Sequence, residues 1–282
     1  MFSKIGGTTD TRGGNAMKKG RFIILLLTLA LVLCACSSPE SKSEEKTSDN
    51  ILTHYEGEGF STPEEAVTYY MKGLKKQDFE QILRAFSWET LMEHYSVEAY
   101  YQNSRGYSPN AGIRMPNNNQ FISTANINQY RSTITRNIYR ALECYILCDS
   151  PEMTTLKSDN EIDAFLQKYD NDRLNKLSEM KDIRFYTPDY ITSNWFSKNE
   201  KRFRADTAKF GADDVKEIVG VADIGDETLI CCPVVARYGS KWFLVDTTSL
   251  TFAILGVRYD FYPFISLPTE KLEEYGFQMV KK

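Results

Sequence analysis

A short apolar run near the start of the chain limits what its first 35 residues can become. Residues 22–33 are apolar except for one threonine, and the basic residues Lys18, Lys19 and Arg21 precede them. A helix that spans a bilayer needs about 20 apolar residues, so this run is too short for a permanent span. A basic group followed by a short apolar stretch is typical of a secretory signal peptide, which is removed and takes no part in the fold.

The run ends in Leu33-Cys34-Ala35-Cys36, which resembles the lipobox of bacterial lipoproteins. In that family a small residue precedes the modified cysteine and an aliphatic residue stands three positions before it, as Ala35 and Leu33 do for Cys36. Cys34 follows the bulky Leu33 and fits poorly. The resemblance implies cleavage between Ala35 and Cys36 and a diacylglycerol on the Cys36 thiol. Acyl chains such as palmitate would hold the protein in the lipid bilayer, on the extracytoplasmic face of the cell membrane.

The alternative interpretation is a short amphipathic or core helix that happens to contain two cysteines. The basic group, the length of the run and the polar stretch after Cys36 favour the signal peptide. Met17 is the more natural start of such a signal, because residues 1–16 are polar and rich in glycine and threonine. We therefore interpret residues 1–16 as an error in assigning the start or as a tolerated extension.

The chain after residue 35 is acidic. Five of the 34 Lys and Arg residues and one of the 38 Asp and Glu residues lie in residues 1–35, which leaves residues 36–282 with a net charge of −8. Binding to nucleic acid depends on neutralising phosphates with basic side chains, so we expect no nucleic-acid partner. The same charge argues against electrostatic binding to anionic lipid, so the acyl chains must provide the anchor.

Residues 37–50 contain no aliphatic or aromatic side chain. Such a stretch cannot bury enough apolar surface to fold, so residues 36–50 are predicted to be the lipidated cysteine and a disordered tether. The length of the remainder, residues 51–282, suits a single domain.

Helix signals open that domain. Thr62-Pro63-Glu64-Glu65 predicts a helix start, with Thr62 as the cap and Glu65 closing a capping box. An apolar stripe at helical spacing follows this start, formed by Ala66, Val67, Tyr70, Met71 and Leu74. Asp78 predicts a second start, and a third helix is expected over residues 90–101.

Two further helices are predicted beyond a break in the pattern. Residues 102–125 are rich in Asn, Gly, Ser and Pro. They are either a functional loop, whose Tyr and Asn suit sugar or peptide contacts, or a variable surface excursion. A long helix with one apolar stripe is expected over residues 127–148. The stripe consists of Ile127, Tyr130, Ile134, Ile138, Ala141, Tyr145 and Cys148. Ser158 predicts the next start. We expect that last helix to bury one apolar face, formed by Ile162, Phe165, Leu166 and Tyr169.

The last third of the domain shows strand patterns. Strands are predicted over residues 215–224 and 227–238, joined by a tight turn at Gly225-Asp226, and a third over residues 241–247. Pro233 cannot donate to a ladder, so it predicts an edge or a bulge in the second strand.

Two stretches resemble the nuclear-transport-factor-2-like, or cystatin-like, family. Residues 61–86, with Thr-Pro-Glu-Glu-Ala and Lys-Lys-Gln-Asp-Phe, are similar to its first helices. Residues 234–247, with Arg-Tyr-Gly-Ser-Lys-Trp-Phe-Leu-Val-Asp, are similar to its closing hairpin. The resemblance implies an α+β fold in which N-terminal helices pack on a curved C-terminal antiparallel sheet around a cone-shaped pocket. Residues at about 102–210 would then be a helical insertion.

The strand over residues 241–247 carries the candidate pocket residues. Trp242 and Asp246 share one of its faces, and some members of the family use a carboxylate in an apolar cone as a general base, where burial raises the pKa. This interpretation gives a small-ligand-binding or enzymatic pocket of the ketosteroid-isomerase-like kind. The alternative is that Asp246 ends the strand and accepts hydrogen bonds from backbone amides of the next turn.

The sequence carries no evident catalytic, metal or cofactor motif. His54 and His94 are its two histidines, and neither has a neighbour at the spacing of metal ligands, so we expect neither a metal nor a cofactor. The leading hypothesis is therefore a non-enzymatic binding or interaction module of the cell envelope. Its partner would be an envelope protein or a small ligand.

Four cysteines follow the signal in two groups. They are either linked by one structural disulfide between the groups or are small buried hydrophobes. These residues are Cys144, Cys148, Cys231 and Cys232.

Overall fold

The computed structural model describes residues 55–105, 113, 115–147, 155–188, 207–247, 249, 263–267 and 277–279. The expected signal peptide, Ala35, Cys36 and the tether lie outside these residues, as does Cys148.

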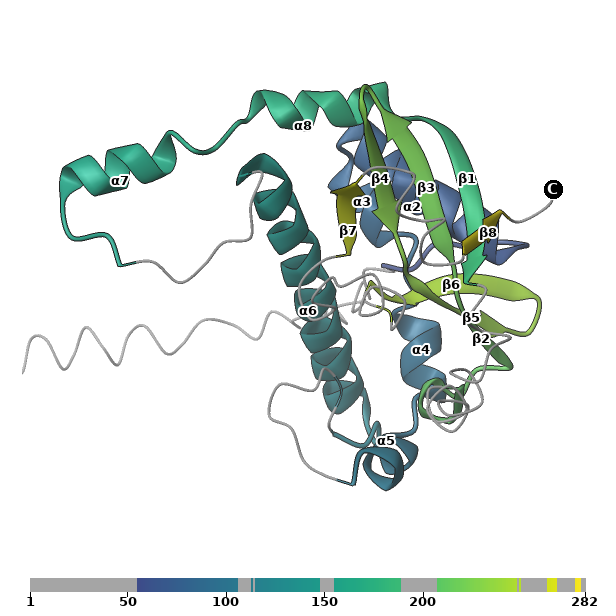
Figure 1. Cartoon of the computed structure of the whole chain (residues 1–282). Coiled ribbons are helices and arrows are strands. Elements are labelled where there is room, and N and C mark those ends of the chain that lie inside the picture. Colours follow the sequence, from purple (N-terminus) through teal and green to yellow (C-terminus); the bar gives the residue numbers. More distant parts are fainter. Residues whose placement is uncertain are drawn as a thin grey trace, which may run out of the picture. The chain divides into compact units, whose positions relative to one another are not determined.

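Most helices precede the strands in chain order (Figure 1). The helices are α2 (Pro63–Lys76), α3 (Phe79–Leu83), α4 (Glu89–His94), α5 (Val97–Ser104), α6 (Gln120–Leu147), α7 (Asp159–Leu166), α8 (Asp172–Lys176) and the 3-10 helix η1 (Leu177–Glu179). The strands are β1 (Lys181–Pro188), β2 (Asp214–Glu217), β3 (Val219–Ile224), β4 (Glu227–Cys231), β5 (Val234–Tyr238), β6 (Lys241–Asp246), β7 (Phe264–Leu267) and β8 (Phe277–Met279). The predicted α+β class is confirmed.

The described strands form two antiparallel sheets instead of the single curved sheet that we expected. One has the order β7-β4-β3-β1-β8, and the other has the order β2-β5-β6. The expected helical insertion at residues 102–210 contains α6, α7 and α8. It also contains β1, which pairs with both β3 and β8 in the larger sheet.

One bent hairpin contributes to both sheets. Asp214 pairs with Arg237 in the smaller sheet, and Gly220 pairs with Cys231 in the larger one. The register is the same in both halves, so no residue is inserted where the hairpin bends. At the bend the Ile218 amide donates to the Pro233 carbonyl oxygen over 3.2 Å.

The bend corrects the strand predictions. The strands expected over residues 215–224 and 227–238 are each divided in two, because Pro233 has no N–H to continue the ladder. The predicted turn at Gly225-Asp226 is confirmed, and Gly225 adopts the positive φ of 56° that glycine tolerates best.

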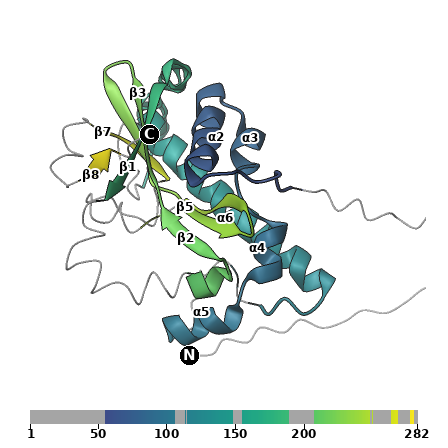
Figure 2. The same ribbon diagram turned by 90° about the vertical axis from the view of Figure 1, so that its right-hand side faces the viewer.

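Helix α2 packs on β3 and also contacts β5 and β6, with α3 beside it (Figures 1 and 2). The predicted apolar stripe of α2 is fully buried. A Cβ atom on Gly220 of β3 would lie 2.8 Å from the Met71 sulfur and 2.9 Å from a Val67 methyl carbon. Because Gly220 has no side chain, the helix can approach the strand closely at this position.

The predicted helix starts are confirmed. Thr62 Oγ1 accepts from the Glu65 amide over 3.1 Å, and Asp78 Oδ1 accepts from the Gln81 amide over 2.9 Å. The Glu65 carboxylate accepts a hydrogen bond over 3.0 Å from the amide of Ser61, the residue before the cap residue Thr62. Side-chain oxygens thus satisfy amides that have no partner within the helix.

The helix expected over residues 90–101 is divided into α4 and α5. The first helix ends at His94, and Ser96 caps the second, since its Oγ accepts from the Ala99 amide over 3.0 Å. Helix α6 begins at residue 120 instead of 127, because Asn119 Oδ1 accepts from the Ile122 amide over 2.9 Å. Its predicted buried stripe is confirmed, from Tyr130 to Tyr145.

Helix α7 begins after Ser158 as predicted, but its apolar face is not buried as we expected. Ile162 is 40% exposed and Leu166 is 58% exposed. The apolar spacing was sufficient to predict the helix, but it did not show that another element covers this face.

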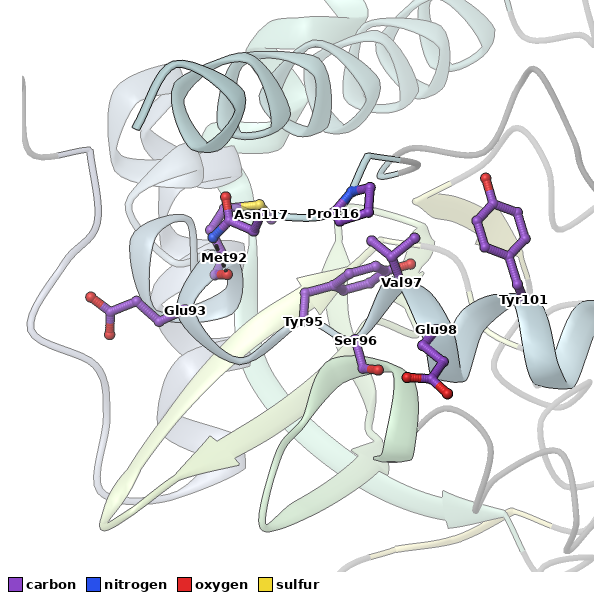
Figure 3. A pocket seen from close by; sticks show the side chains of 9 residues that line it. All are labelled: Met92, Glu93, Tyr95, Ser96, Val97, Glu98, Tyr101, Pro116 and Asn117. Atoms are coloured by element: carbon purple, nitrogen blue, oxygen red, sulfur yellow. Dashed lines mark hydrogen bonds between the residues drawn. The ribbon is translucent and has the colours of Figure 1, made fainter. Parts of the chain in front are cut away.

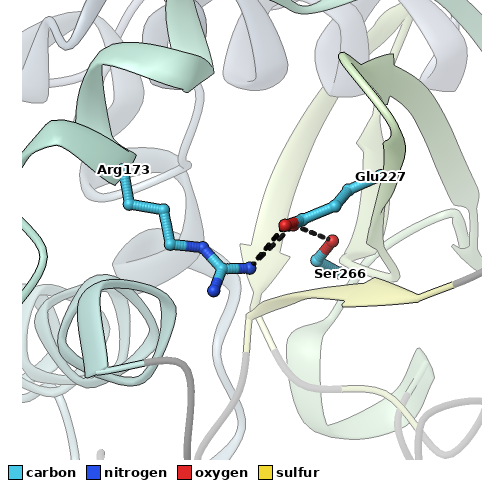
Figure 4. A network of polar contacts seen from close by, with 3 residues as sticks. All are labelled: Arg173, Glu227 and Ser266. Atoms are coloured by element: carbon cyan, nitrogen blue, oxygen red, sulfur yellow. Dashed lines mark hydrogen bonds and ion pairs between the residues drawn. The ribbon is translucent and has the colours of Figure 1, made fainter.

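A polar cluster links α8 to the larger sheet (Figure 4). Arg173 Nη2 donates to both carboxylate oxygens of Glu227 on β4, over 2.9 and 2.7 Å. Ser266 on β7 donates to the same carboxylate over 2.6 Å. The Arg173 guanidinium also lies 4.8 Å from the centre of the Tyr145 ring on α6. Four elements therefore meet at this ion pair.

The carboxylate of Glu56 is buried, and it holds the start of α4. It accepts from the amides of Trp88 and Thr90 over 2.6 and 3.0 Å, and from the hydroxyls of Ser87 and Thr90. Donors at the start of a helix favour a negative charge there. The Tyr55 amide donates to the Glu89 carboxylate over 3.0 Å, so residues 55–56 are tied to this helix through both side chain and backbone.

Cys231 and Cys232 are buried, and neither is in a disulfide in the described part of the chain. They pack as small apolar side chains. Burial raises the pKa of the Cys231 thiol from 9.0 to about 12 and that of Cys232 well above its ordinary value.

We predict that Glu56→Ala lowers the free energy of unfolding by about 3 kcal/mol, because buried amides of α4 lose their acceptor. Glu58→Ala is the matched control, since Glu58 is exposed. It should change this free energy by less than about 0.5 kcal/mol. Urea unfolding of both variants measures the difference. Equal effects of the two substitutions would contradict the role of Glu56.

We also predict that stability falls as the pH rises above about 9, since an unfolded Cys231 thiol ionises there while the native thiol stays protonated up to about 12. The contribution is fully present below pH 9 and is lost towards pH 12. Cys231→Ala should make the fall shallower, by up to about 1.4 kcal/mol per pH unit. Urea unfolding under reducing conditions across this range measures the slope. An unchanged slope would show that the thiol ionises in the native state as well.

Candidate ligand-binding site

A pocket of about 520 Å³ lies between the end of α4, the first turns of α5 and residues 116–117 (Figure 3). Pockets that bind small molecules are usually of about 300–1,000 Å³. Residues 116 and 117 belong to the stretch 102–125, which we interpreted as either a functional loop or a variable surface excursion. The structure thus places part of that stretch against two helices.

Hydrogen bonds fix the walls of the pocket. Asn117 Nδ2 donates to the Met92 carbonyl oxygen over 2.8 Å, which ties one wall to the end of α4. The Ser96 amide donates to the Lys209 carbonyl oxygen over 3.0 Å, so the link between α4 and α5 is held as well. Since Glu56 positions the start of α4, it also supports the pocket at the other end of this short helix.

The interior of the pocket is apolar and aromatic. Met92 and Val97 are buried, whereas Tyr95 and Tyr101 are half-buried. The Tyr95 ring meets the Phe210 ring edge to face, at 6.4 Å between centres. Figure 3 shows Tyr95 and Val97 below Pro116, with Tyr101 further along α5. Two tyrosine rings therefore form part of the pocket wall.

Two acids give the pocket a negative charge. Glu93 and Glu98 line it and are exposed, and they lie on opposite sides of it in Figure 3. One Glu98 oxygen accepts from Gln102 Nε2 over 2.7 Å. Among the described residues that line the pocket, none is basic. The charge of the lining thus favours cationic or neutral ligands over anionic ones.

The predicted pocket residues Trp242 and Asp246 lie on β6, and neither lines this pocket. Trp242 is buried, and its backbone exchanges two hydrogen bonds with Phe60. The charged group of Lys216 lies 5.0 Å from the centre of its indole ring. Trp242 is thus part of the packing of the smaller sheet in the described structure.

Asp246 is half-buried at the end of β6. Burial, and to a lesser extent the negative charge of Asp246, raises the pKa of Tyr130 on α6 well above its ordinary value. Next to it, Asn137 Nδ2 donates to Thr247 Oγ1 over 3.4 Å. A ligand pocket at Trp242 and Asp246 stays a prediction from the sequence.

The described residues contain no group of three or more His, Cys, Asp or Glu side chains that could hold a metal ion. Among the helices described, none is long and apolar enough to cross a membrane.

No protein-family model and no curated protein matches this sequence. Among solved structures, the chain is similar to a cystatin-like protein from Ruminococcus gnavus ATCC 29149, with 12% identity and a TM-score of 0.36. The similarity covers 65% of this chain and 39% of that chain, so this chain spans well under half the length of its neighbour. The likeness is weak, and the fold class rests on the helices and strands described above.

Sequence reasoning missed the side of the pocket that α4 and α5 form. One signal was available, because residues 93–101 combine two acids and three tyrosines around a serine that can cap a helix. The helix expected over residues 90–101 obscured it, since a continuous helix would have spread these side chains around its surface.

We predict that Asn117→Ala loosens the wall that residues 115–119 form, because the hydrogen bond to Met92 is lost. Amide hydrogen exchange in a peptide covering these residues should become about fivefold faster, as expected for about 1 kcal/mol. Asn118→Ala is the matched control, since the Asn118 side chain contacts Asn119 and not α4. Equal exchange rates in the two variants would contradict the proposed role of the hydrogen bond from Asn117 to Met92.

Proposed function

We propose that this protein is a lipid-anchored lipoprotein of the bacterial cell envelope that acts as a non-enzymatic binding module on the extracytoplasmic face of the membrane. The observation that carries the proposal is Leu33-Cys34-Ala35-Cys36 at the end of a short apolar run with a basic group before it. A single acyl chain binds membranes only reversibly, whereas the two chains expected on Cys36 anchor a protein stably.

The pocket between α4 and α5 supports the binding role. Its size, apolar interior and small number of polar groups are those of a ligand site. Its composition favours binding over catalysis. The described part of the lining has no His or Cys, and its serine hydroxyl, on Ser96, is engaged as the cap of α5. A nucleophile needs a neighbouring base within hydrogen-bonding reach, and the residues that line this pocket supply no such pair.

We predict that Cys36→Ser abolishes incorporation of a palmitate analogue in the expressing bacterium, because the thiol that carries the diacylglycerol is lost. Incorporation should fall at least about tenfold, to background, while the chain is still made. Cys34→Ser is the matched control and should keep the label.

Exposure of the domain is measured in the same cells by adding protease to spheroplasts, where an extracytoplasmic domain is cleaved. Label retained in Cys36→Ser, label lost in Cys34→Ser alone, or a domain protected until the cells are lysed would each contradict the proposed anchor.

A further inference from the structure

We infer that the pocket between α4 and α5 binds an organic cation, an ammonium or guanidinium group on an apolar stem. This inference rests on the proposed binding function and names the class of ligand for the same site. The cation is either a free amine or the side chain of a lysine or arginine in a polypeptide.

The charge of the lining is the first support. Glu93 and Glu98 bring two carboxylates to one pocket, and none of the lining side chains that the structure describes is basic. The backbone of Lys209 is bound to the lining residue Ser96, but its charged group lies 4.2 Å from the centre of the Phe210 ring. Two like charges that border one pocket raise its negative potential, and this potential attracts a cation.

The aromatic side chains are the second support. Tyr95 and Tyr101 line the same pocket as the two acids, and ring faces attract cations through their quadrupole. Neither the carboxylates nor the ring faces attract an anion. A neutral polyol forms hydrogen bonds with the lining, but the negative charge does not strengthen its binding. A cation uses both features at once.

The apolar interior is the third support, because it suits the stem of the ligand. Met92, Val97 and Pro116 supply aliphatic contacts. Met115, next to Pro116 in the sequence, is 44% exposed, and Phe121 in the first turn of α6 is 81% exposed. Met115, which adjoins the lining residue Pro116 in the sequence, provides further apolar surface for a ligand that extends from the pocket.

The test compares three probes of similar shape and different charge on the full chain purified in detergent. The probes are phenethylamine, phenethyl alcohol and phenylacetate, and isothermal titration calorimetry measures their affinities. We expect phenethylamine to bind about tenfold more tightly than phenethyl alcohol, and phenylacetate to bind most weakly, with the preference for the amine declining as salt increases.

The variant Glu93→Gln with Glu98→Gln removes both charges and keeps the shape of the pocket. It should weaken phenethylamine binding about tenfold and leave phenethyl alcohol binding unchanged. Glu80→Gln is the matched control, because Glu80 is an exposed acid in the first turn of α3, as Glu98 is in α5. It should not alter either affinity.

The source of the cation is tested with a lysine-containing peptide and the same peptide acetylated on that lysine. A preference for the unacetylated peptide over phenethylamine assigns the site to a polypeptide, and the reverse order assigns it to a free amine. If the alcohol binds as tightly as the amine, the inference fails while the pocket stays a binding site. If no probe binds, the pocket is not a site for small ligands at all, and the palmitate result still decides the anchor separately.

Discussion

The buried carboxylate of Glu56 is the interaction on which the described helical region most depends. A charge taken out of water is tolerated only when donors saturate it, and here two amides and two hydroxyls do so. Those bonds fix where α4 begins. This helix is only six residues long, and it ends at the pocket. They also fix the first described residues of the domain, which continue into backbone pairing between Phe60 and Trp242. The start of the domain, α4 and the smaller sheet are therefore held together by one set of contacts.

The sheets depend on a different constraint, the bent hairpin. Because its register is unchanged through the bend, the turn at Gly225-Asp226 sets the pairing of both sheets at once. Helix α2 can then cover both, with its closest approach at Gly220. The ion pair of Arg173 and Glu227 adds α8 beside that same turn. In physical terms, one local turn sets the register of one strand pair in each sheet.

Features that depend on neighbouring residues could be predicted from the sequence, and those that depend on distant pairs could not. The caps at Thr62, Asp78 and Ser158, the buried stripes of α2 and α6, and the tight turn were all predicted correctly, because each reflects local chemistry. The partners of Glu56 lie more than 30 residues away, and no periodicity marks them. The bend at Pro233 was indicated only as an irregularity, since the sequence does not say which sheet each half joins. Of the residues that line the pocket, the sequence singled out only the stretch that contains Pro116 and Asn117, as either a functional loop or a surface excursion, and not the two helices.

The central claim is that Cys36 anchors this module to the membrane, and mass spectrometry of the protein purified from the membranes of the expressing bacterium tests it most directly. The account predicts a mature chain that begins at Cys36 and carries a diacylglyceryl group on its thiol. A chain that retains residues before Cys36, or a Cys36 with an unmodified thiol, would contradict it.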